Sequence, residues 1–335
     1  MKEAMFYKKL RDNVQCYLCP HYCLIRSGER GKCGVRENRD GLLYSLVYEQ
    51  AYTTAIDPIE KKPLFHFMPG SLTFSMTTVG CNLFCQFCQN WQIARPPEPE
   101  MPITGSTLTP EQIVDRACLN GCQSIAYTYT EPTIFFEYAY ETAKRAHEKN
   151  LKNVFVSNGF ITAEAIDTIS PYLDAINIDL KGFSEEYYRE ICGGRLQPIL
   201  DAIKRYYENN VWVEITTLIV PGYSDNEQTL SKIANFIHSI DDKIPWHVSR
   251  FHPCYEMQNV AVTDVETIEK AISIGKAVGL KYTYAGNLPG NKYVSTFCPN
   301  CQKKIIDRTG FVAKNMHLDK DRCEYCHERI DLVLD

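Results

Sequence analysis

The fold of this chain is decided by the stretch Cys81-Asn82-Leu83-Phe84-Cys85-Gln86-Phe87-Cys88, in which three cysteines share the spacing CxxxCxxC. Just before it, residues 72–78 alternate apolar and hydroxyl side chains, which predicts a buried strand, and Gly80 then releases the chain into a loop. Thiolates this close together bind iron–sulfur clusters or zinc. A CxxC pair alone is typical of structural zinc or a redox dithiol, but three cysteines fall short of the four ligands of structural zinc. A four-iron cluster held here would keep one iron open to a non-protein ligand.

The length, composition and net charge limit the classes of protein to which this chain can belong. The chain has 335 residues, 44% of them hydrophobic and 23% charged, which suits one large α/β domain with small attachments. Its net charge of −5 argues against nucleic acid or an anionic membrane as the main partner. We find no run of about 18 apolar residues and no apolar leader, so we expect neither a membrane span nor a signal peptide.

Fifteen cysteines are the unusual feature of the composition, and eleven of them fall in three clusters with metal-like spacing. The other four stand alone and are expected to behave as small buried hydrophobes: Cys118, Cys122, Cys192 and Cys254. An odd number of cysteines in a long chain is not typical of a secreted disulfide framework. We therefore expect a reducing compartment, and the cytoplasm in particular.

Two outer clusters contain four cysteines each. The first, within residues 1–40, suits zinc or a second iron–sulfur cluster equally well: Cys16, Cys19, Cys23 and Cys33. The second has the spacing of a zinc ribbon, CxxC-x21-CxxC: Cys298, Cys301, Cys323 and Cys326. The ribbon carries equal numbers of basic and acidic residues, which favours a structural or protein-docking role over nucleic-acid binding.

Between these clusters, strand and helix signals alternate, which predicts a parallel α/β sheet in the form of a full or partial (β/α) barrel. The expected strands are 72–78, 123–129, 154–157, 175–180, 211–218, 246–251 and 281–284, and the expected helices are 110–119, 134–149, 163–169, 197–209, 226–239 and 264–278. We divide the chain into a cysteine-rich segment (1–40), a lead-in (41–70), the barrel (71–292) and a ribbon-like module (293–335). Charged residues of the lead-in are expected to be mostly solvated.

Polar residues are predicted at the carboxyl ends of the strands, where barrels carry their chemistry: Glu131, Ser157, Asn158, Asp179, Lys181, Glu214 and His252. Each has a structural alternative. Glu131 could favour the next helix N-terminus or accept hydrogen bonds from an ammonium group. Asp179 and Lys181 could pair with each other or contact a ligand, and His252 could be a cap or a ligand contact. No glycine-rich phosphate loop accompanies them, which argues against a nucleotide held by its phosphates.

Residues 71–290 resemble radical S-adenosylmethionine (SAM) enzymes of the pyruvate-formate-lyase-activating type. The resemblance rests on the cysteine motif, with the aromatic Phe87 before its last cysteine, and on the segments that begin at Thr130, Ser157, Asp179 and Val220. It implies a [4Fe–4S] cluster on Cys81, Cys85 and Cys88, with SAM on the open iron. The cofactor contacts that it implies are Phe87, Glu131, Ser157, Asn158, Asp179, Lys181 and His252. Glu214 is added to these candidates only because of its expected place near a strand end.

The resemblance also implies a reaction, in which SAM is cleaved reductively to a 5′-deoxyadenosyl radical that abstracts hydrogen from an unidentified substrate. The substrate could be a small molecule or, as in activating enzymes, a glycine of a protein. An electron donor such as flavodoxin or ferredoxin is expected. A hypothesis of another class is a non-catalytic metal-binding adaptor.

Three further segments resemble the radical enzyme of the AmmeMemoRadiSam system: the N-terminal cysteine segment, residues 57–67, and Cys88-Gln89-Asn90-Trp91. This resemblance implies Memo-like and AMMECR-type proteins as partners, and it supplies no substrate.

Overall fold

The computed structural model describes residues 1–98 and 101–335, which form two compact units. Unit 1 contains residues 1–57, 72–176 and 188–212, and unit 2 contains residues 58–71, 177–187 and 213–335. Both units contribute strands to one α/β sheet of eight strands in the order β16-β15-β14-β13-β12-β11-β9-β8. The order is open, because β16 and β8 lie at opposite ends of it, so the partial form of the predicted barrel is the one observed.

Unit 1 contains the first half of the strand–helix alternation. Its sheet strands are β8 (Thr53–Pro58, whose last residue belongs to unit 2), β9 (Leu72–Thr77), β11 (Ser124–Tyr127), β12 (Lys152–Ser157) and the start of β13 (Ala175–Asp179). Its helices are α1 (Trp91–Ala94), α2 (Pro110–Leu119), α3 (Phe136–Glu148), α4 (Ala163–Ile169) and α6 (Leu196–Glu208). Strand β11 pairs in parallel with both β9 and β12, and all four of its residues are buried, as expected for an inner strand of a parallel sheet.

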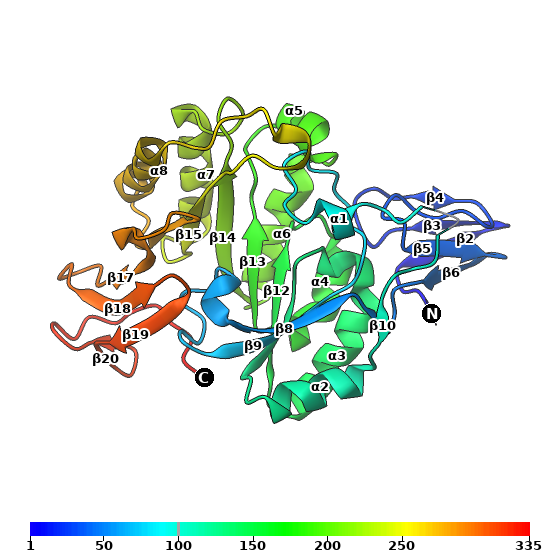
Figure 1. The fold of residues 1–335 in the computed structure, drawn as a ribbon, viewed down its shortest axis with the longest axis horizontal. Helices are drawn as coiled ribbons and strands as arrows, with labels where there is room; N and C mark the ends of the chain where they lie inside the picture. The colour runs from blue at the N-terminus through cyan, green and yellow to red at the C-terminus, as the bar shows by residue number, and fades with distance from the viewer. Residues whose placement is uncertain (99–100) are drawn as a thin grey trace. The chain divides into compact units, whose positions relative to one another are not determined.

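The helices of unit 1 begin where the sequence provides caps. Helix α2 starts with a capping box, in which Thr109 and Gln112 exchange hydrogen bonds, and Pro110 occupies its first turn. Figure 1 shows α2 and α3 side by side. A single turn of 3₁₀ helix, Pro132–Phe135, leads into α3, and a π-helical turn, Tyr188–Cys192, precedes α6.

The N-terminal part of unit 1 has more regular structure than the sequence indicated. It contains short antiparallel strands: β1 (Lys2–Glu3), β2 (Tyr7–Leu10), β3 (Asn13–Cys16), β4 (Leu24–Ile25), β5 (Arg36–Arg39), β6 (Leu42–Ser45) and the pair β7 (Gln50–Ala51) and β10 (Ser106–Thr107). Strands β2 to β6 lie together in Figure 1, drawn in blue. These strands have only two to four residues each, which is too short for a period-2 pattern to stand out in the sequence.

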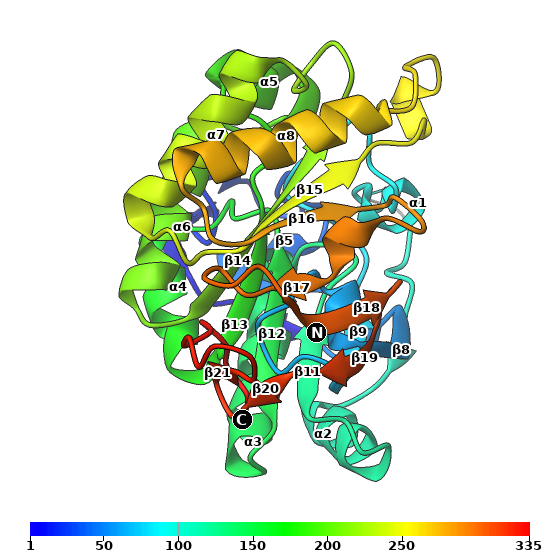
Figure 2. The same ribbon diagram turned by 90° about the vertical axis from the view of Figure 1, so that its left-hand side faces the viewer.

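Unit 2 continues the alternation with α5 (Glu185–Tyr187), β14 (Trp212–Ile219), α7 (Glu227–Ile240), β15 (Trp246–Arg250), α8 (Val265–Val278) and β16 (Thr283–Gly286). Strands β14, β15 and β16 pair in parallel. Figure 2 shows α7 and α8 side by side, and α8 packs on β15 and β16. Helix α8 ends at Gly279, whose φ of 106° is the left-handed conformation that favours glycine at a helix C-terminus. Every predicted strand and helix of residues 72–284 is therefore confirmed, to within about two or three residues at each end.

The C-terminal part of unit 2 is a small antiparallel module. It consists of β17 (Thr296–Phe297), β18 (Lys304–Thr309), β19 (Val312–Met316), β20 (Leu318–Asp319) and β21 (Arg322–Cys323). A buried apolar cluster joins two of its cysteines to β16 and to the lead-in: Phe65, Tyr282, Tyr284, Cys298, Ile305, Cys323 and Ile330.

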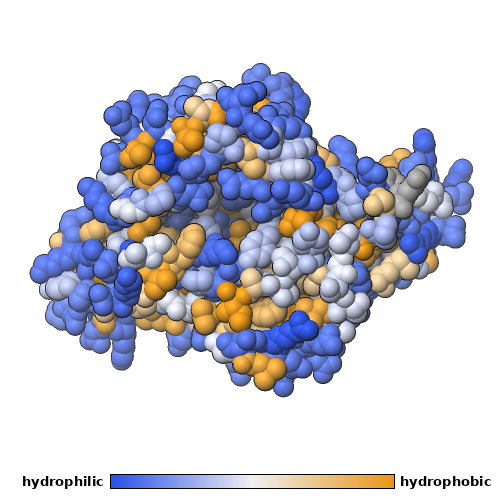
Figure 3. All heavy atoms as spheres, viewed as in Figure 1, coloured by the Kyte–Doolittle hydropathy of each residue, from blue (hydrophilic) through white to orange (hydrophobic). Residues whose placement is uncertain are grey.

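The face of the molecule in Figure 3 is mostly hydrophilic, with apolar residues in scattered groups. Across the described ranges, no helix has the length and apolar character that crossing a bilayer requires.

Candidate functional site

The three central cysteines lie on a loop that follows β9 in unit 1. Cys85 is buried and Cys81 and Cys88 are half-buried. The loop begins at Gly80, whose φ is 95°. A Cβ atom at this position would lie 2.8 Å from Val35 Cγ1 and 2.9 Å from the carbonyl oxygen of Cys33, so the close approach of the N-terminal segment requires a glycine here.

The cysteine loop is anchored through its backbone to the π-helical turn before α6. The amide of Phe84 donates to the carbonyl oxygen of Cys192 over 2.7 Å, and the amide of Gln86 donates to that of Ile191 over 3.0 Å. Phe87 is 4% exposed, so its side chain is buried. The backbone hydrogen bonds to Cys192 and Ile191 hold the loop in place through its main chain.

Glu131, Ser157 and Asn158 lie together beside this loop, as expected for polar residues at the carboxyl ends of neighbouring strands. Glu131 Oε1 accepts hydrogen bonds from the backbone amide (3.0 Å) and hydroxyl (2.6 Å) of Thr133 and from the hydroxyl of Ser157 (2.8 Å). Its Oε2 accepts from the backbone amide of Asn158 at 2.8 Å. Burial raises the pKa of Glu131, and these hydrogen bonds oppose the shift without cancelling it.

Asn158 links this carboxylate to the cysteines. Its side-chain amide donates to Cys81 Sγ at 3.7 Å and to Asn82 Oδ1 at 2.9 Å. Asn82 in turn donates to the carbonyl oxygen of Phe160 at 2.7 Å. Sequence reasoning did not single out Asn82, although its place directly after Cys81 inside the motif was a usable signal.

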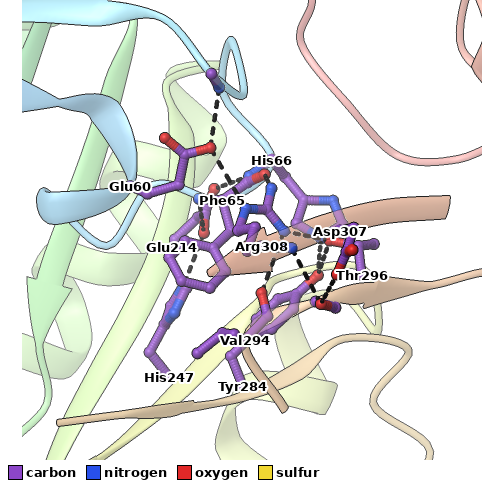
Figure 4. Close-up of polar contacts among 12 residues, drawn as sticks. Glu60, Phe65, His66, Glu214, His247, Tyr284, Val294, Thr296, Asp307 and Arg308 are labelled. Carbon is purple, nitrogen blue, oxygen red and sulfur yellow. Dashed lines mark hydrogen bonds and ion pairs between the residues drawn. The ribbon is translucent and has the colours of Figure 1, made fainter. Parts of the chain in front are cut away.

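Glu214 has a different environment from the one predicted. It is the third residue of β14 and therefore lies toward the amino end of the strand, not at its carboxyl end. It is 0% exposed, and both of its oxygens are occupied inside unit 2 (Figure 4). Oε1 accepts from the amide of His66 at 2.8 Å, and Oε2 accepts from the amide of Phe65 at 2.9 Å and lies 2.7 Å from His247 Nε2. The expectation that Glu214 lies at a carboxyl strand end is therefore wrong, and its partners give it a structural role inside unit 2.

The lead-in, expected to be mostly solvated, forms the other side of this network. Glu60 and His66 are both fully buried. Arg308 of β18 pairs with Glu60 at 3.3 Å and donates to the carbonyl oxygen of Phe65 at 2.6 Å, and His66 Nε2 lies 2.5 Å from the hydroxyl of Tyr284 (Figure 4). Burial lowers the pKa of His66 to about 4, so its imidazole is neutral at pH 7. The expectation of solvated side chains was therefore wrong for Glu60 and His66, whereas Lys61 is exposed as expected.

Asp179, Lys181 and His252 also belong to unit 2. Lys181 Nζ lies 2.7 Å from Asp179 Oδ2, so the mutual ion pair is present at the carboxyl end of β13. His252 follows β15 and is exposed. All three lie at or just after a carboxyl strand end, as predicted, and nothing in unit 2 assigns them a ligand.

The cysteines of the C-terminal module form a compact group. All four sulfurs lie within 4.8 Å of one another, with Cys298 Sγ 3.6 Å from Cys326 Sγ and Cys301 Sγ 3.7 Å from Cys323 Sγ. Four sulfurs bound tetrahedrally at about 2.3 Å from zinc would lie about 3.8 Å apart. The group therefore has the size of a closed single-metal site.

The N-terminal cysteines gather around one cavity in unit 1. Besides Cys16, Cys19, Cys23 and Cys33, its walls include His21, Arg36 and Asn82. Cys16 ends β3 and Cys23 precedes β4, and the amide of Cys16 donates to the carbonyl oxygen of Cys23 at 2.9 Å. The hairpin thus brings together the cysteines that the sequence spacing grouped.

Comparison with known proteins relates the chain to one enzyme superfamily. A model described as the radical SAM superfamily matches residues 75–237. An uncharacterised protein of Methanocaldococcus jannaschii is 45% identical over 338 residues and is covered completely, as is this chain. The pyruvate formate-lyase-activating enzyme of Staphylococcus aureus is 22% identical over 224 residues, which cover 61% of this chain and 88% of that enzyme.

Among solved structures, a radical SAM methyltransferase from Sphaerobacter thermophilus is similar to this chain with a TM-score of 0.51 and 17% identity. The match covers 65% of this chain and 66% of the methyltransferase. At this identity the likeness concerns the fold alone.

Proposed function

We propose that Cys81, Cys85 and Cys88 hold a [4Fe–4S] cluster at which SAM is cleaved reductively. The proposal is supported by the radical SAM superfamily match over residues 75–237 and by similarity to pyruvate formate-lyase-activating enzyme. The observation that carries the proposal is the meeting of this three-cysteine loop with Glu131 and Asn158 at the carboxyl ends of neighbouring strands. Superfamily membership supports an enzyme with radical chemistry rather than a non-catalytic adaptor.

The residues fit such a cofactor. The loop supplies three thiols, one fewer than the irons of the cluster, which leaves one iron for SAM. The amide of Asn158 points at Cys81 Sγ, and an N–H donor to a ligating sulfur stabilises the reduced form of a cluster. With cluster and SAM bound, the cofactors supply a 5′-deoxyadenosyl radical that takes a hydrogen atom from the substrate.

Glu131 is the residue proposed to meet the amino group of SAM. Its Oε1 accepts three hydrogen bonds inside the protein and its Oε2 accepts one, so Oε2 retains acceptor capacity. Ser157 and Asn158 hold this carboxylate in place. In unit 2, Asp179, Lys181 and His252 remain candidates for further cofactor contacts, and Phe87 is proposed to pack behind the cluster.

The substrate is proposed as one of two kinds. Similarity to pyruvate formate-lyase-activating enzyme favours a glycine of a protein partner as one candidate, and a small molecule is the other. Enzymes of this superfamily use an electron donor, and we propose a flavodoxin or ferredoxin for this chain. Memo-like and AMMECR-type partners, zinc in the C-terminal module and a cytoplasmic location are further proposals from the sequence.

The test is anaerobic reconstitution of the full chain with iron and sulfide, followed by reduction with dithionite in the presence of SAM. We expect 5′-deoxyadenosine to form, and we expect Cys85→Ala to abolish it. The matched control is Cys118→Ala, which changes an exposed cysteine outside the clusters and should leave the yield unchanged. Failure of fully loaded protein to cleave SAM, or full activity in Cys85→Ala, would contradict the proposal.

A further inference from the structure

The N-terminal and C-terminal groups each contain four cysteines, but their sulfurs are spaced differently. Among the residues that the structure describes, the ribbon cysteines form a set whose sulfurs all lie within 4.8 Å of one another, and no three of the N-terminal cysteines do so. A single zinc ion draws four sulfurs to about 3.8 Å from one another. A cubane cluster binds each cysteine through a different iron, which holds the sulfurs much farther apart, at roughly 6 Å.

The central loop provides an internal comparison. Cys81, Cys85 and Cys88 also lie outside any such compact set in the described part of the chain. The C-terminal sulfurs are grouped as compactly as in a zinc site, whereas the N-terminal sulfurs, like those of the central loop, are not. The four N-terminal cysteines are nevertheless not scattered, because all of them line one shared cavity.

Arg36 gives a second, independent observation at this cavity. Its side chain is 2% exposed and lines the cavity together with Cys16 and Cys33. Nη1 lies 3.0 Å from Glu137 Oε1, and Nη2 donates to the carbonyl oxygen of Met5. The Nε–H donor is buried and has no hydrogen-bond partner among the residues that the structure describes. A buried N–H without an acceptor is costly, by about 1–3 kcal/mol, so this group calls for an acceptor in the cavity that it lines.

We propose that Cys16, Cys19, Cys23 and Cys33 bind a second [4Fe–4S] cluster, with Arg36 Nε–H donating to one of its sulfurs. A cluster with four thiolate ligands carries net negative charge, and its sulfides and thiolates accept hydrogen bonds. This matches a guanidinium N–H that has no acceptor in the described part of the chain. Four cysteines leave no iron open, so this cluster does not bind substrate. The assignment goes beyond the proposed SAM cleavage and does not depend on it.

The proposed cluster is adjacent to the central loop. Asn82, the residue after Cys81, lines the N-terminal cavity, and its carbonyl oxygen lies 2.7 Å from His21 Nε2. The carbonyl oxygen of Cys33 packs against Gly80 at the start of the loop. Gly80 and Asn82 are the sequence neighbours of Cys81, so the second cluster would lie next to the loop that carries the first cluster. Both clusters would lie in unit 1.

The decisive experiment removes the central cluster. The full-length triple variant Cys81→Ala/Cys85→Ala/Cys88→Ala is reconstituted anaerobically with iron and sulfide, with zinc also present. We expect about four irons and four sulfides per chain and an absorbance band that bleaches with dithionite. One zinc in place of the iron at this site, or no cluster at all in a variant that still folds, overturns the proposal. Loss of SAM cleavage in this variant tests only the proposed function.

A reciprocal variant tests the same proposal independently, in case the triple variant does not fold. Cys16→Ser/Cys33→Ser should lower the iron content of the full chain from about eight to about four. The matched control, Cys298→Ser/Cys301→Ser, should lower zinc and leave iron unchanged. Equal iron in the wild type and in Cys16→Ser/Cys33→Ser, at about four per chain, overturns the proposal.

Arg36 is tested as a positioning residue through the potential of the cluster. Arg36→Lys keeps a cation beside Glu137 but removes the Nε donor, so the N-terminal cluster should become harder to reduce while its iron content is unchanged. Arg36→Lys is made in the triple variant so that only one cluster contributes to the titration. An unchanged potential overturns the assignment of Arg36.

Discussion

Glu131 and Glu214 are two buried glutamates with different surroundings, although the sequence predicted the same kind of site for both. They are 2% and 0% exposed. Glu131 accepts hydrogen bonds from neutral donors of unit 1, and no cation is paired with it among the residues that the structure describes. Glu214 has its own partner, His247, at 2.7 Å. A buried carboxylate without a protein cation is the one suited to receive a cation from a ligand.

The pKa values of the two carboxyls differ in direction for the same reason. Burial raises the pKa of Glu131, and its neutral donors do not reverse the shift. Burial acts on Glu214 in the same sense, but the hydrogen bond and charge of His247, with the amides of Phe65 and His66, hold the pKa below its ordinary value. The carboxylate form is therefore stabilised by the protein at Glu214 and is left dependent on a ligand at Glu131.

Removing Glu214 should produce the largest effect on stability. Glu214→Ala leaves His247 and two buried amides without acceptors, and we expect it to lower the free energy of unfolding by about 3–5 kcal/mol. Urea titration followed by the fluorescence of the tryptophans, including Trp246 of β15, measures the loss. Glu266→Ala, at an exposed position of α8, is the control and should change stability by less than about 0.5 kcal/mol. If Glu214→Ala lowered the free energy of unfolding by less than about 0.5 kcal/mol, the structural role assigned to Glu214 would be wrong.

Replacing Glu131 should have a smaller effect on stability and a larger one on SAM. In Glu131→Gln, one carboxylate oxygen becomes an NH₂ group that faces donors, which should cost about 1–3 kcal/mol. The affinity for SAM, measured by equilibrium dialysis on reconstituted protein, should fall about tenfold or more, because the charge that meets the ammonium is lost. The exposed Glu148→Gln of α3 should bind SAM normally. Wild-type affinity in Glu131→Gln with normal iron content would assign it a structural role like that of Glu214.

The contrast between the two glutamates shows what the sequence could and could not predict. Strand and helix positions followed from periodicity, because the inner strands are mostly buried, β11 over its whole length, and alternate with amphipathic helices. The expected strand, 211–218, put Glu214 in its first half, so the assignment of Glu214 to a carboxyl strand end did not follow from the predicted boundaries. Only its partners could not be foreseen, because His66 lies 148 residues away in a segment without regular structure.

The cysteine clusters show a similar limit. Spacing grouped the cysteines correctly, since CxxC turns bring thiols together locally. Spacing could not separate zinc from iron in the N-terminal group, because both metals accept four thiolates. Among the described residues, only the ribbon cysteines form a compact set of sulfurs, and Arg36 Nε has no hydrogen-bond partner. These two observations support the distinction, and both depend on the tertiary structure.

The opposite pKa directions predict opposite dependences on pH, which is the finest test of the contrast. A carboxyl whose folded pKa is depressed stabilises the protein above the unfolded value of about 4.3 and loses that contribution as pH falls through the folded pKa. Glu214→Gln should therefore cost more at pH 7 than at pH 4. A carboxyl whose folded pKa is raised stabilises the fold at low pH and loses that contribution as pH rises through the folded pKa. Glu131→Gln should therefore cost less at pH 7 than at pH 4.

Each difference should amount to about 1.4 kcal/mol per unit of pKa shift, measured as the wild-type minus variant free energy of unfolding at each pH. Taking the difference cancels the metal loss on acidification that wild type and variant share. If both variants changed with pH in the same direction, the two carboxyls would share one kind of environment. The distinction between a carboxylate held by a histidine and backbone amides of the protein and one that awaits a ligand cation would then fail.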